Sequence, residues 1–155
     1  MRRCFLTGCY TGLLPKAPGT WGSLFGVVAA YAILLFLPQS TLFLLAILLS
    51  VVAVKEINIY EKQTQTHDDP SIVIDEIVGI FFGASILPNT HPIWLLVLFV
   101  TFRFFDIKKP SIIGRAEKLQ GGLGVMADDI IAGIAAGLLT GVIYVIFIRL
   151  IDINF

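Results

Sequence analysis

The long uncharged stretches of this chain are the feature that most limits how it can fold. No charged residue occurs between Trp21 and Val54, and a second long apolar run covers residues 125–148. Charged residues make up 14% of the 155 residues, whereas a soluble domain carries about 25% because its surface needs them. A chain of this length cannot bury a 57% share of hydrophobic residues in its own core. The sequence therefore predicts an integral membrane protein and excludes a disordered chain, a disulfide scaffold and an ordinary soluble globule.

Five apolar runs predict an all-α fold, a compact membrane bundle of about five helices. A Pro-Gln-Ser breaker at 38–40 divides the first uncharged stretch into two runs, which we expect to form a helical hairpin. The other runs cover residues 72–87, 93–105 and 125–148. The fourth run is short enough to be re-entrant or merely buried. We interpret residues 1–155 as a single domain.

The charged residues gather at one end of this predicted bundle. The turns at 38–40 and 88–92 contain no Lys, Arg, Asp or Glu. The charged residues beyond the last run are only Arg149 and Asp152. Because Lys and Arg in short loops mark the cytoplasmic face, we expect a polar site facing the cytoplasm. The 11 basic and 11 acidic residues leave no basic excess, so nucleic acid is excluded as a partner. The lipid bilayer is the expected partner, and an oligomer is left open.

Acidic residues stand in adjacent pairs beside or inside the apolar runs. Six of the 11 acids form three pairs and a seventh ends the fourth run: Asp68–Asp69, Asp75–Glu76, Asp128–Asp129 and Asp106. An acid inside an apolar helix costs several kcal/mol unless a partner offsets it, so we interpret the second and third pairs as functional. Asp68 or Asp69 precedes Pro70 and is equally well interpreted as a helix cap.

Small residues recur at helical spacing from two of these acids. The rows are Asp75, Gly79 and Gly83 in the third run, Asp129, Gly133, Gly137 and Gly141 in the fifth, and Gly22, Gly26 and Ala30 in the first. Small residues at this spacing let membrane helices approach closely, so we expect Asp75 to lie next to Asp129. Two carboxylates at close range repel each other, and a bound divalent cation relieves the repulsion. Oxygen ligands favour magnesium, calcium or manganese over zinc.

Basic and small polar residues accompany these acids. The basic residues of the loop after the fourth run are Arg103, Lys108, Lys109, Arg115 and Lys118. They anchor the chain to anionic head groups or bind a phosphate. Gly121 and Gly122 lead into the fifth run, where backbone N–H groups bind an anion or simply form a turn. Thr20 and Ser23 follow a tight turn before the first run; helix capping is the favoured role and phosphate contact the alternative.

The ordered set of these residues resembles the phosphatidylglycerophosphatase A family. The matching residues are Gly12, Pro15 and 18–23; His67, Asp68, 71–73, Asp75, Glu76 and Gly79; Phe102, Arg103, Asp106, Lys109 and Pro110; Gly121, Gly122, Gly124, Met126, Asp128, Asp129, Ala132 and Gly133. The resemblance implies an all-α, Mg²⁺-dependent phosphatase of the bacterial inner membrane. It also implies the reaction, conversion of phosphatidylglycerol phosphate to phosphatidylglycerol and inorganic phosphate in phospholipid biosynthesis.

Our mechanistic hypothesis assigns a role to each polar residue. The metal ligands are Asp75, Glu76, Asp128 and Asp129, for one or two Mg²⁺ ions. The base is Asp68 or His67, and Asp106 either fixes a basic residue or binds a metal. The phosphate contacts are Arg103, Lys109 and Arg115, with Thr20, Ser23 and Gly122 as further contacts. Attack by water and a covalent phospho-enzyme both stay open.

The rival interpretation is a small cation or proton transporter subunit, in which acids inside the membrane form an ion path. Such a path needs polar groups through the full depth of the membrane. The helix halves remote from the acids are almost purely apolar, which favours the enzyme.

Overall fold

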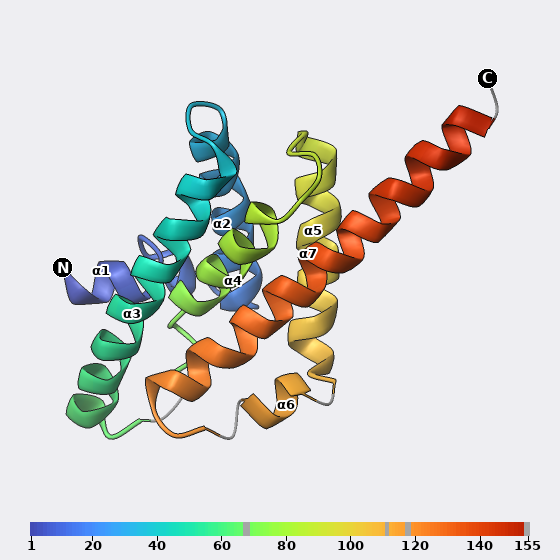
Figure 1. Ribbon diagram of the computed structural model, residues 1–155. Helices are drawn as coiled ribbons and strands as arrows, with labels where there is room; N and C mark the ends of the chain where they lie inside the picture. Colours follow the sequence, from blue (N-terminus) through green and yellow to red (C-terminus); the bar gives the residue numbers. More distant parts are fainter. Residues whose placement is uncertain (67–68, 111, 117–118, 154–155) are drawn as a thin grey trace.

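The computed structural model describes residues 1–66, 69–110, 112–116 and 119–153, and within these ranges it contains helices and no strand (Figure 1). The helices are α1 (Arg2–Leu6), the 3-10 helix η1 (Thr11–Leu13), α2 (Pro18–Leu34), α3 (Gln39–Thr64), α4 (Ile74–Ser85), α5 (Pro92–Lys108), α6 (Ile112–Ala116) and α7 (Gly122–Ile153). The all-α prediction is confirmed. The five predicted runs correspond in order to α2, α3, α4, α5 and α7, to which the structure adds the short helices α1 and α6.

Prolines mark where three of the long helices begin. Pro18 and Pro92 are the first residues of α2 and α5, where the missing N–H of proline costs no helical hydrogen bond. Pro38 is the extended residue before α3, so the predicted breaker separates the two arms of the α2–α3 hairpin. These positions explain why one uncharged stretch becomes two helices.

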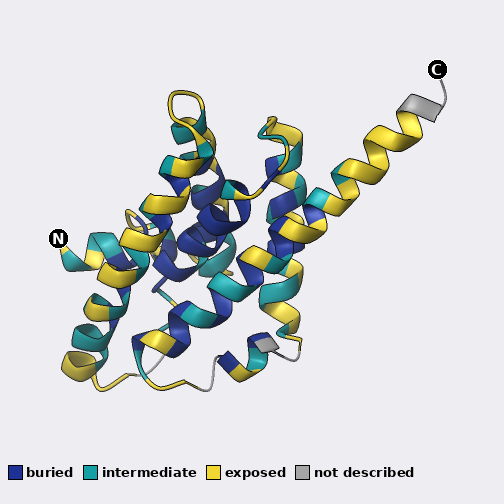
Figure 2. Cartoon of the chain, in the orientation of Figure 1, coloured by how far each residue is buried: buried dark blue, intermediate teal, exposed yellow. Residues whose placement is uncertain are grey.

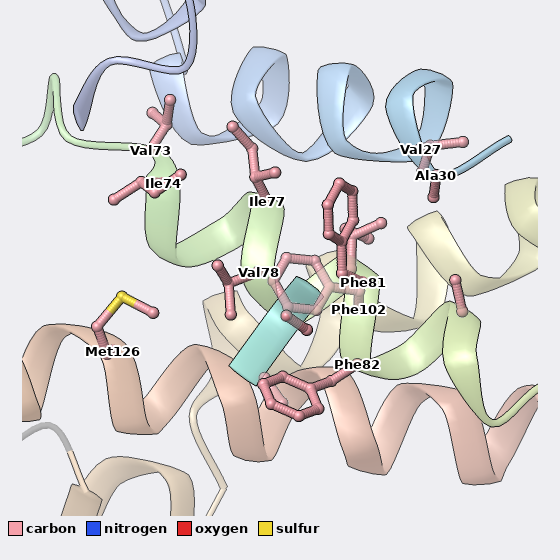
Figure 3. Packing of buried hydrophobic residues seen from close by; sticks show 14 of the residues in the cluster. Val27, Ala30, Val73, Ile74, Ile77, Val78, Phe81, Phe82, Phe102 and Met126 are labelled. Carbon is pink, nitrogen blue, oxygen red and sulfur yellow. The ribbon is translucent and has the colours of Figure 1, made fainter. Parts of the chain in front are cut away.

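Helix α4 lies at the centre of the bundle and contacts α2, α3, α5 and α7. Ten of its 12 residues are buried, and Figure 3 shows labelled side chains of α4, such as Ile77 and Phe82, filling the space toward its neighbours. A helix of this length is about 18 Å long, well short of a hydrocarbon layer of about 30 Å. Helix α4 is therefore a protein-covered core helix whose N-terminal turn carries Asp75 and Glu76.

The predicted glycine rows form the contacts between α4 and its neighbours. A Cβ atom on Gly79 would lie 2.6 Å from the Asp129 carbonyl oxygen, and one on Gly83 would lie 2.8 Å from that of Gly133. The row on α2 meets the opposite side of α4, where a Cβ on Gly26 would lie 3.1 Å from the Ile77 Cα. The backbones approach this closely only because the side chains are absent, which confirms the predicted packing.

The outward faces of the long helices are apolar. Leu44, Val51 and Val142 are more than half exposed, and Figure 2 shows exposed residues along the outside of α3 and over the last turns of α7. Helices α3 and α7 are long and apolar enough to cross a membrane, and α2 is a shorter apolar helix. Two helices are thus candidate membrane spans, and the membrane bundle of about five apolar helices stays a prediction.

The two ends of the bundle differ in composition. Figure 1 places the α2–α3 turn and the α4–α5 connection at one end, and α6 with the start of α7 at the other. The first end contains the uncharged turns at 38–40 and 88–92, while the second gathers Asp75, Asp106 and Asp129. The bundle is therefore polar at one end, and that this end faces the cytoplasm stays a prediction.

Candidate active site

A cavity of about 290 Å³ opens at the polar end of the bundle. Its walls come from the start of α2, the start of α4, the end of α5, the first turns of α7 and the segment before α4. The lining residues are Ala17, Pro18, Gly19, Asp69, Pro70, Ile72, Asp75, Glu76, Arg103, Asp106, Lys109, Val125, Asp128 and Asp129. Four helices thus bring acids and bases from distant parts of the sequence to one place.

Three carboxylates converge inside this cavity. Asp75 and Glu76 come from the first turn of α4 and Asp129 from α7, and one oxygen of each lies within 4.8 Å of the others. Asp75 and Asp129 are only 7% and 4% exposed. The glycine contacts of α4 with α7 produce this convergence, so the predicted approach of Asp75 and Asp129 is confirmed.

The surroundings of these carboxylates fit a divalent cation. Within the described part of the chain the buried Oε2 atom of Glu76 has no hydrogen-bond partner, which is costly for a carboxylate oxygen. Among the described residues, six carboxyl groups line the cavity together with two cationic side chains, Arg103 and Lys109. Carboxylates held this closely in a low-dielectric site need protons or a cation to offset their charge, and carboxylate oxygen is the ligand that Mg²⁺ prefers.

Asp128 has a different partner from its neighbour Asp129. The Lys109 ammonium donates a hydrogen bond to Asp128 Oδ2 at 2.8 Å, and the Asp128 side chain lies outside the group of three converging carboxylates. Adjacent residues on a helix point about 100° apart, which explains why the pair divides in this way. Asp128 was predicted to bind a metal and Lys109 a phosphate. In the structure the two side chains contact each other.

Arg103 reaches the cavity from the last turns of α5. Its Nη1 atom lies 2.6 Å from Asp106 Oδ2, one turn further along the same helix, and donates a hydrogen bond to Ser23 Oγ at 3.3 Å. Its buried Nε atom has no hydrogen-bond partner among the described residues. Asp106 thus lies against a basic residue, and its side chain also lies next to that of Asp129, so both of its predicted roles stay predictions.

Gly19 is a cavity residue that the sequence motifs included without giving it a role. A Cβ atom at this position would contact Glu76 Oε1 and lie 3.1 Å from Arg103 Nη1. The absence of a side chain at Gly19 therefore lets Glu76 and Arg103 both approach the first turn of α2 at the same point. The only signal in the sequence is its place in a Pro-Gly turn, which is also the signal of an ordinary turn.

The favoured capping role of Thr20 and Ser23 is wrong. Both residues lie inside α2, whose N-cap is Ala17 and makes no side-chain hydrogen bond. Ser23 is fully buried and donates its hydroxyl to the Gly19 carbonyl oxygen at 2.7 Å. Helix capping by Asp69 is also wrong, because the N-cap of α4 is Val73. The capping pattern failed for α2 because this helix begins at Pro18, before Thr20 and Ser23.

Several predicted site residues lie elsewhere. The Gly122 N–H donates to Asn58 Oδ1 at 2.9 Å and packs against α3, so the structure does not bring it to the cavity. Arg115 is exposed on α6, and neither it nor Thr20 lines the cavity. His67 and Asp68, the candidates for the base, lie outside the described residues.

Asp69 joins the cavity wall to α3. Its Oδ1 accepts the Ser71 N–H at 2.9 Å, and its Oδ2 accepts the Tyr60 hydroxyl at 2.7 Å. Partial burial opposes the charge of this carboxylate, but hydrogen bonds from Ser71 and Tyr60 and the nearby charge of Arg3 outweigh it and lower the pKa of Asp69. Asp69 is thus held as a carboxylate whose two oxygens both accept hydrogen bonds.

Replacing Tyr60 by Phe should destabilise the fold at neutral pH and not in acid. A carboxylate with a lowered pKa contributes stability above its unfolded pKa, and this contribution is lost as the pH falls through the folded pKa. We expect the Tyr60→Phe change to cost about 1 kcal/mol at pH 7, a small figure because Asp69 is partly exposed. Thermal unfolding in detergent at neutral pH and at about pH 2, well below the pKa of an ordinary aspartate, checks this. Tyr31→Phe, on the exposed side of α2, is the control, and an equal loss at both pH values would contradict the prediction.

In this helical bundle, clustered carboxylates stand beside cationic side chains, an arrangement suited to phosphoryl chemistry. The sequence model of a family described as Phosphatidylglycerophosphatase A matches residues 4–144. The chain belongs to the phosphatidylglycerophosphatase A family and is a phosphatase. The family resemblance seen in the sequence is confirmed.

Two curated relatives carry the name of this family, and a third is named as another lipid phosphatase. A Haemophilus influenzae protein named Phosphatidylglycerophosphatase A is 38% identical over 83% of this chain and 80% of its own length. An Escherichia coli protein of the same name is 37% identical over 85% of this chain and 77% of its own length. A Bacteroides thetaiotaomicron protein, provisionally named a phosphatidylinositol-3-phosphatase, is 34% identical over 88% and 89%. No solved structure matches the chain.

Proposed function

We propose that this phosphatase hydrolyses the phosphate monoester of phosphatidylglycerol phosphate, giving phosphatidylglycerol and inorganic phosphate, and that it depends on Mg²⁺. The observation that carries the proposal is the cavity in which Asp75, Glu76 and Asp129 converge beside Arg103. The choice of phosphatidylglycerol phosphate as the substrate rests on the names of the Haemophilus and Escherichia relatives. The place of the reaction is then phospholipid biosynthesis.

Three carboxylates would hold the metal. Asp75, Glu76 and Asp129 offer oxygen atoms at mutual distances that one cation can bridge, and the unpartnered Oε2 of Glu76 would gain a partner. When bound, Mg²⁺ supplies positive charge that offsets the charge of the phosphate and of the reacting water. The described residues contain a single group of three converging carboxylates, which supports at least one metal of the one or two predicted.

Arg103 and Lys109 bind the phosphate in this proposal. Asp106 and Asp128 hold these two cations at the cavity by direct ion pairs of 2.6 Å and 2.8 Å. A guanidinium held at the cavity wall in this way suits the planar, two-point grip that arginine makes on phosphate oxygens. Asp106 therefore acts on the arginine, and the base that activates water is assigned to His67 or Asp68, which lie outside the described residues.

The acyl chains of the substrate stay in the bilayer. We propose a multi-pass protein of the bacterial inner membrane with the cavity on the cytoplasmic side, supported by the apolar outer faces of α3 and α7. The transporter interpretation has no support, since the acids gather at one end and family membership makes the chain a phosphatase.

Phosphate release from the purified protein in detergent tests the proposal. We expect release from phosphatidylglycerol phosphate with Mg²⁺, loss of release after EDTA, and recovery when Mg²⁺ is restored in excess. Phosphatidylinositol 3-phosphate, taken from the name of the Bacteroides relative, is the comparison lipid. No release from phosphatidylglycerol phosphate would contradict the substrate, and an unchanged rate in EDTA would contradict the metal.

A further inference from the structure

We propose that Ser23 is a positioning residue that holds the Arg103 guanidinium for the incoming phosphate group. Because Arg103 binds the phosphate only under the proposed function, this inference rests on it. Ser23 itself is fully buried and does not line the cavity, so it contacts no substrate. Its effect on the reaction therefore passes through the arginine.

The hydroxyl of Ser23 connects two helices. It donates to the Gly19 carbonyl oxygen at 2.7 Å, within α2, and accepts from Arg103 Nη1 at 3.3 Å, across to α5. A serine hydroxyl has one hydrogen to donate and two lone pairs, so it can make both bonds at once. Because the first bond uses the only hydrogen, the oxygen is left facing Arg103 as an acceptor. The backbone of α2 thus sets the direction of the contact.

Two acceptors fix one end of the guanidinium. Asp106 holds Nη1 from the same helix at 2.6 Å and carries charge, while Ser23 holds it from a different helix and is neutral. With Nη1 bound to protein, the buried Nε of Arg103 still has no partner in the described ranges. These two contacts fix the orientation of the guanidinium at the wall of the cavity, where a phosphate oxygen can accept from its remaining N–H groups.

Gly19 makes this arrangement possible from the other side. Its missing side chain leaves the space between Glu76 Oε1 and Arg103 Nη1, where a Cβ would lie 3.1 Å from the latter. The first turn of α2 therefore does two things at once. It supplies the carbonyl that orients Ser23, and it keeps a side chain out of the space beside the arginine.

A double-mutant cycle with Arg103 tests the inference. We expect Ser23→Ala to lower kcat/KM for phosphatidylglycerol phosphate about tenfold, the factor that one hydrogen bond to a charged group carries. In an Arg103→Ala background the same change should have less than about a twofold effect, because the group it positions is gone. Ser50→Ala is the matched control: Ser50 donates the same bond, to Ala46 O at 2.7 Å, on α3 and away from the cavity. It should stay within about twofold of wild type.

A second readout needs no catalysis. Inorganic phosphate added with Mg²⁺ should raise Tm in wild type and in Ser50→Ala, and the rise should shrink in Ser23→Ala and in Arg103→Ala. Equal rises in wild type and Ser23→Ala, or losses of kcat/KM that multiply in the double variant, would overturn the inference. Absence of phosphate release from the wild type would contradict the proposed function instead. The Ser23–Arg103 contact would still be tested in that case, because the phosphate-induced change in Tm does not depend on catalysis.

Discussion

Replacing Asp129 by Asn should lower kcat for phosphate release by about a thousandfold. The change keeps the shape of the side chain and removes its charge and one of its two oxygens. Asp129 is 4% exposed and one of its oxygens lies within 4.8 Å of those of Asp75 and Glu76, so the change weakens one of the three ligands that would hold the metal. Phosphate release at saturating substrate and Mg²⁺ measures the loss.

Asp128→Asn is the matched control for this prediction, since the same change is made one residue away. Asp128 pairs with Lys109 and lies outside the three converging carboxylates, so we expect a loss of only about tenfold. The two variants should also differ without substrate: Mg²⁺ should raise Tm in Asp128→Asn, and much less in Asp129→Asn. An equal or larger loss of kcat in Asp128→Asn would show that the metal ligands are assigned to the wrong member of the pair.

Replacing Gly133 by Ala should lower the free energy of unfolding by about 3 kcal/mol. The nearest atoms to a Cβ at this position all belong to the backbone of Gly79, which cannot move aside as a flexible side chain can. Helices α4 and α7 would have to separate, and Asp75 would move away from Asp129. We therefore expect a loss of activity together with the loss of stability, measured by thermal unfolding and phosphate release on the same samples.

Gly141→Ala provides the control on the same helix. The nearest atom to a Cβ at Gly141 is Pro88 Cδ at 3.6 Å, an ordinary contact, so the added methyl group fits. Alanine is a better helix former than glycine by about 1 kcal/mol, and this variant should be as stable as wild type or slightly more stable. If Gly133→Ala and Gly141→Ala gave the same Tm, close packing at Gly133 would not hold α4 and α7 together.

The helices and their main contact followed from the sequence because their signals are strong. Uncharged runs ended by proline predict helix positions, and glycines at every fourth residue mark the faces that touch. These two patterns were enough to place Asp75 beside Asp129. Spacing alone could not divide an adjacent pair of acids, because only the rotation of α7 against α4 decides that Asp129 faces Glu76 while Asp128 faces Lys109.

Other roles depended on contacts that no local pattern encodes. The sequence pattern predicts Ser23 to be a helix cap. Helix α2 begins earlier, at Pro18, so Ser23 lies inside the helix and its hydroxyl contacts Arg103. The sequence pattern predicts Gly122 to be part of an anion-binding turn, but its N–H donates a hydrogen bond to Asn58 of α3. Each of these partners comes from a helix distant in the sequence, which explains why residue type and spacing were insufficient.

The central claim is that Asp75, Glu76 and Asp129 form one divalent cation site in a phosphatase cavity. Crystals grown with Mn²⁺ in place of Mg²⁺ test it most directly, because the anomalous signal of manganese locates the ion without relying on activity. We predict one strong anomalous peak in direct contact with all three carboxylates, in the cavity that Arg103 also lines. A peak held by Asp128 and Asp106 instead, or no peak in crystals of protein that is active with Mn²⁺, would contradict the account.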